Sequence, residues 1–376
     1  MSARLTSDQL ARDLAVRDLA DPAAGRHALQ LLPHNVVTAL VARWGCAVRW
    51  CRGDRVVTIE DNYDNLGYAG EAVTRDARYT RYVDDGRMLR SHSSALVPAA
   101  LRAMSADPVE DVLLVCPGIV YRRDAIDRLH TGTPHQLDLW RVSRSPLGAA
   151  DLDTMITAVL AAVLPGATDR REPRVHPYTL DGRQIDVLHD GEWVEVAEGG
   201  LAHPDVLRKA GLDEGWHGLA LGLGLDRLLM LVKGIPDIRL LRSPRPAVAA
   251  QMTDLTPYRP VSTMPPIHRD ISIAVDADDL VEDLGDRVRH ALADDAHSVE
   301  SVAILQETPC ADLPAQAIAR LGARADQKNV LVRIVLRRLD TTLSNKDANA
   351  LRDRIYAALH RGTAHQWAAT PPDPDR

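Results

Sequence analysis

Apolar residues recur at two spacings along this chain, and each spacing predicts a different kind of element. Between residues 27 and 44 they return every three or four positions, as on the buried face of a helix. The pattern then changes to short β-rich runs at 47–50 and 56–59. An unbroken apolar run at 112–116 predicts a buried strand that ends at a Pro-Gly pair.

A hairpin and a helix are predicted in the middle of the chain. Two strand-like runs, 185–188 and 193–196, flank Asp190-Gly191, a pair typical of tight hairpin turns. Beyond Asp226 the apolar residues return to helical spacing, and the predicted helix ends at Gly234.

The last third of the chain is organised differently. Six prolines between residues 243 and 266 mark a connector between domains. The order strand, helix, strand, strand, helix follows, which suggests a ferredoxin-like α/β sandwich. Ser344, three residues before Asp347, predicts the capped start of the last helix. The predicted strands are 271–275, 299–305 and 330–336, and the predicted helices are 279–292 and 345–360.

The composition is that of an ordinary globular protein. The chain of 376 residues is 45% hydrophobic and 26% charged, which suits about two domains. Its four cysteines show no zinc spacing and read as thiols of a reducing cytoplasm. The N-terminus has no uninterrupted apolar run, so we predict neither a signal peptide nor a membrane span. The net charge of −7 neither indicates nor excludes a nucleic-acid partner, because tRNA is bound by local basic patches.

Two segments carry candidate chemistry. Arg122 and Asp124 follow the predicted strand 112–116, where a guanidinium can bind an α-phosphate and stabilise charge in a transition state. The second segment, 218–227, alternates glycine or alanine with leucine and ends in Arg227 at a helix start. Glycines allow a ligand to approach the backbone. Taken singly, a solvated arginine and helix packing through small residues explain these segments equally well.

Together the two segments resemble motifs 2 and 3 of class II aminoacyl-tRNA synthetases, and most closely the single-chain phenylalanyl-tRNA synthetases. LRSHSS at 89–94 is similar to that family's "LRTHTS", and VYRRD at 120–124 with HQLD at 135–138 is similar to its "VYRRD" and "FHQLEG". HPYT at 176–179 resembles "FPFT", and WVEV at 193–196 resembles "WLEV". The C-terminal part, from Tyr258, resembles the ferredoxin-fold anticodon-binding domain of the same enzymes.

The resemblance implies an α+β fold, in which an antiparallel-sheet class II catalytic domain precedes a ferredoxin-like βαββαβ domain. It covers roughly residues 28–362. The expected division is a helical N-terminal extension at 1–27, a catalytic domain at 28–245, a linker at 246–257, an anticodon-binding-like domain at 258–362 and a disordered tail at 363–376.

The resemblance also implies roles for individual residues. Arg122 and Arg227 would be catalytic. Arg122 would hold the α-phosphate and the amino-acid carboxylate. Arg227 would contact the outer phosphates and lie against the adenine. Glu195, with Asp186, would bind Mg²⁺, a hard cation that prefers carboxylate and phosphate oxygens. The further ATP-binding residues would be Asp124, His130, Gly222 and Gly224. The amino-acid-binding residues would be His92, Ser94, Gln136, Asp138, His176, Tyr178, Glu198, Gly199 and Ala220.

The predicted side-chain pocket departs from the family pattern. His176 and Tyr178 stand where the family has two ring-stacking phenylalanines, and Glu198 begins the segment that replaces its "GCG". Because a buried carboxylate is costly unless it is paired, we hypothesise a substrate more polar than phenylalanine, such as a hydroxylated or heteroaromatic amino acid. A Glu198 that points to solvent is the alternative.

Three readings of function stay open at this point. The first is an aminoacyl-tRNA ligase, with an amino acid, ATP and tRNA as its partners. The second is a paralogue that passes the activated amino acid to a non-tRNA acceptor, which the acidic C-terminal part favours, since acids outnumber bases by four from residue 254 onward. Arg333, Arg337 and Arg338 could still form a local basic patch there. The third is a non-catalytic binding protein that retains the fold. No oligomeric state follows from the sequence.

The chain contains no phenylalanine at all. One hypothesis is that the enzyme is made while charged phenylalanine tRNA is scarce or misacylated. Compositional drift is the alternative.

Overall fold

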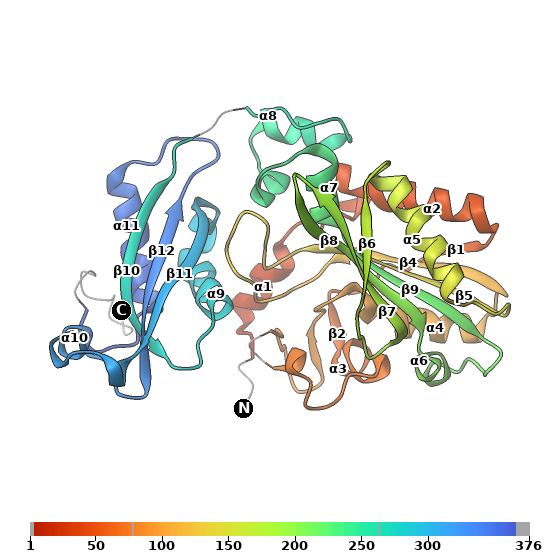
Figure 1. The fold of residues 1–376 in the computed structure, drawn as a ribbon, viewed down its shortest axis with the longest axis horizontal. Helices are drawn as coiled ribbons and strands as arrows, with labels where there is room; N and C mark the ends of the chain where they lie inside the picture. Colours follow the sequence, from red (N-terminus) through yellow and green to blue (C-terminus); the bar gives the residue numbers. More distant parts are fainter. Residues whose placement is uncertain (1–3, 77–78, 262–263, 366–376) are drawn as a thin grey trace. The chain divides into compact units, whose positions relative to one another are not determined.

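The structure is a computed structural model that describes residues 4–76, 79–261 and 264–365. It divides into two compact units (Figure 1). The first contains residues 1–122, 133–236 and 249–258, and the second contains residues 123–132, 237–248 and 259–376. The predicted division into domains stays a prediction; it assigned residues 123–132 and 237–245 to the catalytic domain, whereas the compact units group both segments with the C-terminal part.

A seven-stranded sheet forms the centre of the first unit. Its strand order is β1-β4-β5-β9-β8-β7-β6, and every neighbouring pair is antiparallel except β1 and β4. The strands are β1 (Ala47–Trp50), β4 (Asp111–Ile119), β5 (His135–Ser143), β6 (Asp169–Pro173), β7 (Thr179–His189), β8 (Glu192–Ala202) and β9 (His217–Gly224). The predicted hairpin is therefore present as β7 and β8, with Asp190 and Gly191 in the turn at positive φ.

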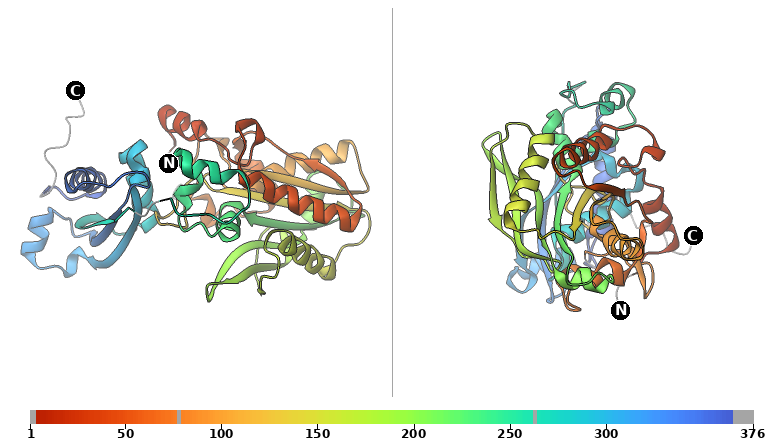
Figure 2. Two further views of the ribbon diagram at one scale, coloured as in Figure 1. Left: turned by 90° about the horizontal axis from the view of Figure 1, so that it is seen from above. Right: turned by 90° about the vertical axis from the view of Figure 1, so that its right-hand side faces the viewer.

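Strand β9 shows why the predicted glycine-rich segment matters. Alternate residues of a strand point to opposite faces. Leu219, Leu221 and Leu223 are buried on one face, whereas Gly222 and Gly224 are partly exposed on the other. Helix α5 (Ala149–Val163) packs on β8 and β9, and α2 (Leu31–Trp44) packs on α5; both can be followed in Figure 2 by their yellow and red colours. The opposite face of β9 is covered by a core cluster at Ala220 and is open only toward Gly222 and Gly224.

The remaining elements of the first unit are short. The described part of the N-terminal extension contains helix α1 (Ser7–Ala15) and a short 3₁₀ helix (Pro22–Ala24), and Leu19 and Ala20 between them are buried. The ATP-binding segment predicted to begin a helix does so in α7 (Leu225–Lys233), which ends at Gly234 in the left-handed conformation. The other elements are β2 (Val56–Thr58), α3 (Ile59–Asn62), β3 (Arg87–Leu89), α4 (Val97–Ala106) and α6 (Pro204–Lys209), while α8 (Pro246–Ala249) lies where the two units join in sequence.

The second unit contains the predicted C-terminal elements. Its three-stranded antiparallel sheet has the order β10-β12-β11, and the chain order of the main elements is βαββα. The elements are β10 (Ile267–Asp276), α9 (Val281–Leu292), β11 (Val299–Pro309), α10 (Ala315–Leu321), β12 (Gln327–Leu336) and α11 (Asn345–Leu359). Ser344 caps α11 as predicted, accepting a hydrogen bond from the Asp347 backbone. A fourth strand of the expected βαββαβ order is not among the described residues, and most of the predicted tail lies outside them.

Residues 123–132 pack within the second unit although they connect β4 to β5. Ile126 is buried in the core cluster of that unit, and its carbonyl accepts a hydrogen bond of 2.9 Å from the Val302 backbone. The Arg289 guanidinium donates to the Ala125 carbonyl at 2.7 Å. The loop is therefore held by packing as well as by polar contacts.

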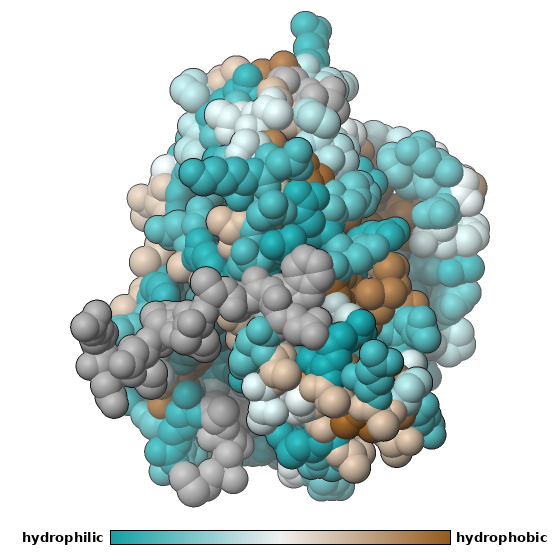
Figure 3. Space-filling model, turned by 90° about the vertical axis from the view of Figure 1, so that its left-hand side faces the viewer, coloured by the Kyte–Doolittle hydropathy of each residue, from teal (hydrophilic) through white to brown (hydrophobic). Residues whose placement is uncertain are grey.

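One face of the molecule shows how polar and apolar side chains are distributed on the surface. The face drawn in Figure 3 is largely hydrophilic, and its hydrophobic residues form small separate groups. None of the helices within the described ranges is long and apolar enough to cross a bilayer.

Candidate active site

One row of residues across the sheet places three predicted site positions side by side. Asp138 on β5 is paired in register with Gly222 on β9, and Gly222 is paired with Glu198 on β8. Paired residues point to the same face of a sheet. Because Gly222 has no side chain, the sheet surface between the two carboxylates is uncovered, and we call this surface over Gly222 the open floor. The Cα atoms of Asp138 and Glu198 are two strand spacings, or roughly 10 Å, apart. An ideal Cβ on Gly222 would meet only the Glu198 carbonyl, at 3.7 Å.

A β-bulge brings Glu195 to the same face. Glu195 and Glu198 are three residues apart, so a regular strand would point them in opposite directions. The register between β7 and β8 skips Val196, since Ile185 pairs with Ala197 and Asp186 pairs with Glu195. One extra residue reverses the alternation. Desolvation and then the nearby charge of Glu198 raise the pKa of Glu195, which is consistent with this shared face.

Asp138 is a buried carboxylate at the bottom of the open floor. Its exposed fraction is 2%, and desolvation raises its pKa to about 6. Hydrogen bonds from Ser94 and from the Trp140 indole, at 3.2 Å, oppose that rise. The carboxylate has few partners for a group so buried, so a cation bound beside it would favour its ionised form. An ammonium group is such a cation.

Aromatic side chains form one wall of the site. The ring of His92 stacks on Tyr68 with centroids 5.7 Å apart, and Tyr68 lies 6.2 Å from Tyr178. Tyr178 also lies 6.2 Å from Trp140 and 5.5 Å from His176. Desolvation, and then the positive charge of Arg122, lower the pKa of His92 to about 3, so the ring is neutral. The site is thus bounded by neutral rings on one side and by carboxylates on the floor.

Glu198 is paired rather than solvated. Its Oε2 lies 2.9 Å from His176 Nε2, and its Oε1 forms an ion pair with Arg174 Nε at 3.0 Å. Desolvation acts to raise the pKa of Glu198, but the His176 hydrogen bond and the nearby charges lower it overall. Glu198 is therefore an ionised group held in the site by two partners. The buried His176 Nδ1 has no hydrogen-bond partner in the structure.

The positive charges of the two predicted catalytic arginines act to lower the pKa values of two carboxyl groups on strand β8. Arg122 lies just beyond β4, where its Nε donates to the Ser91 carbonyl at 2.9 Å, and its charge lowers the pKa of Glu198. Arg227 lies in the first turn of α7, where it donates to the Glu195 carbonyl at 3.0 Å and acts on the pKa of the Glu195 carboxyl. The two guanidinium groups thus approach the open floor from segments about a hundred residues apart in sequence.

The predicted Mg²⁺ ligands differ in their fit. The buried Asp186 is already engaged, because Arg170 Nη2 lies 2.7 Å from one carboxylate oxygen and Gln184 donates to the other at 2.9 Å. Glu195 is exposed and has a raised pKa, so its carboxylate would gain from a cation. In the described part of the chain, no three His, Cys, Asp or Glu side chains gather to hold a metal ion by themselves. The donor set fits a cation shared with phosphate oxygens and held through Glu195, and it does not fit Asp186.

Three other predicted residues are not among those that share this face of the sheet. Asp124 and His130 belong to the second unit, where His130 Nδ1 lies 2.7 Å from the Asp127 carboxylate. Gly199 faces away from the floor, since an added Cβ would meet the Ala220 carbonyl and Leu221. Their predicted roles stay predictions. By contrast Gln136 lies on the floor side, paired with Gly224.

Sequence reasoning missed Trp140, Tyr68 and Arg174. Trp140 could have been found, because it is two residues from Asp138 on the same strand face. Tyr68 lies in an irregular segment far from the motifs, and Arg174 is an exposed residue whose partner is distant in sequence. Neither position carries a local signal.

Comparison with known proteins identifies the family. The family model described as "tRNA synthetases class II core domain (F)" matches residues 13–252, more than half of the chain. The chain belongs to this class II synthetase core family. The match includes the seven-stranded sheet and all of the candidate site of the first unit, and it ends before the strands of the second unit.

Individual relatives are phenylalanine–tRNA ligase alpha subunits. The synthetase core chain is 33% identical over 230 residues to that of Prochlorococcus marinus (strain MIT 9313), covering 60% of this chain and 66% of the relative. It is 33% identical over 204 residues to that of Leptospira biflexa, covering 51% and 59%. The chain therefore spans less than two thirds of these relatives. A solved pyrrolysyl-tRNA synthetase structure from Desulfitobacterium hafniense is 21% identical, with coverage of 62% and 78% and a TM-score of 0.45.

Proposed function

We propose that this synthetase core protein is an AMP-forming aminoacyl-tRNA ligase that activates phenylalanine or a related, more polar aromatic amino acid with ATP and transfers it to tRNA. The observation that carries the proposal is the row Asp138–Gly222–Glu198, an open floor approached by Arg122 and Arg227. An amino acid needs an anion for its ammonium group, and a triphosphate needs guanidinium groups.

The first step requires positioning more than a protein nucleophile. A carboxylate oxygen of the amino acid attacks the α-phosphorus of ATP, the new C–O–P bond forms, and the bond to pyrophosphate breaks. In this proposal Asp138 and Gln136 hold the ammonium group, and Arg122 holds the reacting carboxylate and the α-phosphate. Arg227 stabilises the charge of the leaving pyrophosphate. Mg²⁺ bound through Glu195 would neutralise phosphate charge.

The side-chain pocket supports a polar ring substituent. His176 and Glu198 lie across the open floor from Asp138, so an amino acid bound there places its ring toward them. The Arg174–Glu198–His176 contacts already neutralise the carboxylate. A neutral ring hydroxyl or ring nitrogen can therefore share these hydrogen bonds at a lower cost than a charged group.

Amino-acid-dependent pyrophosphate exchange tests the first step. The full chain is assayed with phenylalanine, tyrosine, meta-tyrosine and pyridylalanine, and Gly222→Val is the matched variant. Its added side chain fills the floor, and the space around Gly222 makes little loss of stability expected. Exchange by the native protein and at least a 100-fold loss in Gly222→Val support the proposal. No exchange with any amino acid, or equal exchange by both proteins, contradicts it. A clear preference for phenylalanine over every polar analogue contradicts only the proposal that the substrate carries a polar ring substituent.

A non-tRNA acceptor is the second candidate, and the charges of the second unit favour it. Arg333, Arg337 and Arg338 were predicted to form a basic patch, but Arg333 is paired with Asp270 at 2.8 Å and Arg337 with Glu300 at 2.6 Å. An arginine that is paired with a carboxylate attracts the phosphates of a nucleic acid less strongly than an unpaired one. Exchange activity without transfer to any tRNA of the source cell would select this candidate, and aminoacylated tRNA would exclude it.

A further inference from the structure

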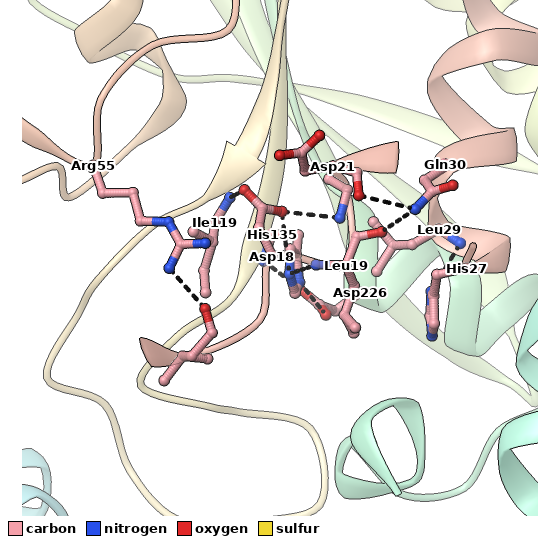
Figure 4. Close-up of polar contacts among 12 residues, drawn as sticks. Asp18, Leu19, Asp21, His27, Leu29, Gln30, Arg55, Ile119, His135 and Asp226 are labelled. Carbon is pink, nitrogen blue, oxygen red and sulfur yellow. Dashed lines mark hydrogen bonds and ion pairs between the residues drawn. The ribbon is translucent and has the colours of Figure 1, made fainter. Parts of the chain in front are cut away.

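A buried polar network lies beside the candidate site and takes no part in the chemistry proposed above (Figure 4). His135, with an exposed fraction of 0%, lies between Asp18 and Asp226, whose exposed fractions are 7% and 5%. His135 Nδ1 lies 2.9 Å from Asp226 Oδ1, and the His135 backbone N–H donates to the other Asp226 oxygen. The network combines two carboxylates and an imidazole that are all largely shielded from bulk water.

The hydrogen bonds determine the tautomer of His135. The Leu19 backbone N–H donates to Nε2 at 3.0 Å, so Nε2 is an acceptor and carries no proton. Nδ1 must then carry the ring proton and donate it to Asp226. Both ring nitrogens are used within the protein, so His135 has no atom left for a substrate. It is a neutral connector and not a general base.

The network joins three segments that are distant in sequence. Asp18 accepts hydrogen bonds from the backbone N–H groups of Ala20, at 2.9 Å, and Ile119, at 3.1 Å, so the N-terminal segment is bound to the end of β4. His135 is the first residue of β5, and Asp226 is the second residue of α7. Figure 4 shows His135 between the two aspartates.

The network lies where the β5–β9 pairing ends and helix α7 begins. The pairing of β5 with β9 ends at Gln136 and Gly224, so the His135–Asp226 contacts lie just past the last pair of the ladder. Helix α7 begins after Gly224, and no side-chain cap holds its first turn. Asp226 is thus the group that connects this turn to β5. Gln136 and Arg227, both predicted to bind substrate, are each one residue away.

We propose that His135 is a positioning residue for amino-acid activation, whose neutral imidazole sets the first turn of α7 and thereby aims Arg227 at the triphosphate. The inference rests on the proposed function. Apolar side chains would fill a buried space at lower cost than two carboxylates and an imidazole, so the polar contacts must be explained by the geometry that they impose. The buried segment at Asp18 and Leu19 becomes part of the scaffold of the site.

Two substitutions at His135 separate its two hydrogen bonds. In His135→Asn the amide nitrogen takes the place of Nδ1 and can still donate to Asp226, but the acceptor for Leu19 is lost. In His135→Gln the amide oxygen reaches the place of Nε2 and can still accept from Leu19, but the ring donor to Asp226 is lost and only the backbone N–H of residue 135 still donates to Asp226. Positioning of Arg227 predicts that the ATP KM in pyrophosphate exchange rises at least 10-fold in His135→Gln, and that His135→Asn restores it to within about threefold of the native value.

Controls separate this role from a loss of folding. Leu101→Ala removes a buried side chain of the same unit, far in sequence from the network, and should lower the unfolding midpoint without raising the ATP KM. ATP affinity is also measured directly by titration calorimetry, so that the result does not depend on exchange. Equal ATP affinities in both His135 variants, or losses that follow the unfolding midpoint in all three proteins, overturn the inference. If the native protein binds ATP without exchange, the proposed function fails while the affinities of the variants still decide this inference. If the native protein binds no ATP, both fall.

Discussion

Asp138→Asn is the most informative substitution in the candidate site, because it should raise stability while removing activity. The native carboxyl is buried, and its pKa in the folded protein is about 6 instead of 3.8. This difference corresponds to about 3 kcal/mol, since each pKa unit is worth about 1.4 kcal/mol. The folded-state pKa is the higher one, so the folded state binds the proton more tightly than the unfolded state. Ionisation of Asp138 therefore costs stability as the pH rises from about 4 to above 6.

The expected measurement is the change with pH of the stability difference between variant and native protein. Asparagine does not ionise, so any packing or hydrogen-bond effect of the amide is independent of pH and cancels. Between pH 4.5 and pH 8 the difference should move by about 2 kcal/mol in favour of Asp138→Asn, the part of the total of about 3 kcal/mol that falls in this range. Urea unfolding followed by tryptophan fluorescence measures it.

Asp61→Asn supplies a control of opposite sign. Desolvation acts to raise the pKa of Asp61, but hydrogen bonds from Arg102 and Asn65 lower it overall. Its ionisation therefore stabilises the folded state above the unfolded pKa of 3.8, so Asp61→Asn should lose nearly the same stability at pH 8 and at pH 4.5, and the loss should shrink only as the pH falls below about 4. A stability difference for Asp138→Asn that does not move with pH would refute the reasoning about its burial. We expect Asp138→Asn to weaken amino-acid affinity in the exchange assay by about 10- to 100-fold. An unchanged affinity would refute the role of Asp138 in binding the ammonium group.

Three further predictions concern the metal, a glycine and a helix cap. Glu195→Gln should raise the Mg²⁺ concentration needed for half-maximal exchange at least 10-fold, whereas Asp186→Asn should change it less than threefold because Asp186 is engaged by protein partners; the reverse order would contradict the assignment. Gly118→Ala should lower the free energy of unfolding by at least about 2 kcal/mol, because φ is +153° and a Cβ would lie 2.2 Å from the buried Arg90 guanidinium; an unchanged urea midpoint would show that Arg90 moves freely. Ser344→Ala should cost about 1 kcal/mol by removing the α11 cap, measured on the unfolding of the second unit, and Ser344→Gly should cost less.

The elements of this protein could be predicted from local sequence. The hairpin at Asp190-Gly191, the stop of α7 at Gly234 and the Ser344 cap depend on neighbouring residues and are present where expected. The family resemblance indicated the class II fold, which the match to residues 13–252 confirms. The roles of the site residues stay predictions.

The geometry of the site depended on tertiary structure. Spacing alone puts Glu195 and Glu198 on opposite faces, and only the bulge at Val196, set by the pairing of β7 with β8, brings them together. The partners of Glu198, the contacts that engage Asp186 and the placing of Ile126 in the second unit likewise join residues with no local relation.

The sequence by itself determined the approximate positions of several helices and strands and of local features such as the Asp190-Gly191 turn and the Ser344 cap, because backbone preferences, caps and periodicity act over a few residues. It did not set every bound, since β4 continues through the predicted Pro-Gly stop to Ile119 and β7 begins at Thr179. Only the tertiary structure decided which carboxylates are paired and which face the open floor, and that His135 lies between Asp18 and Asp226. Strand order and register bring together residues more than a hundred positions apart, and the burial and charge of each group depend on those neighbours.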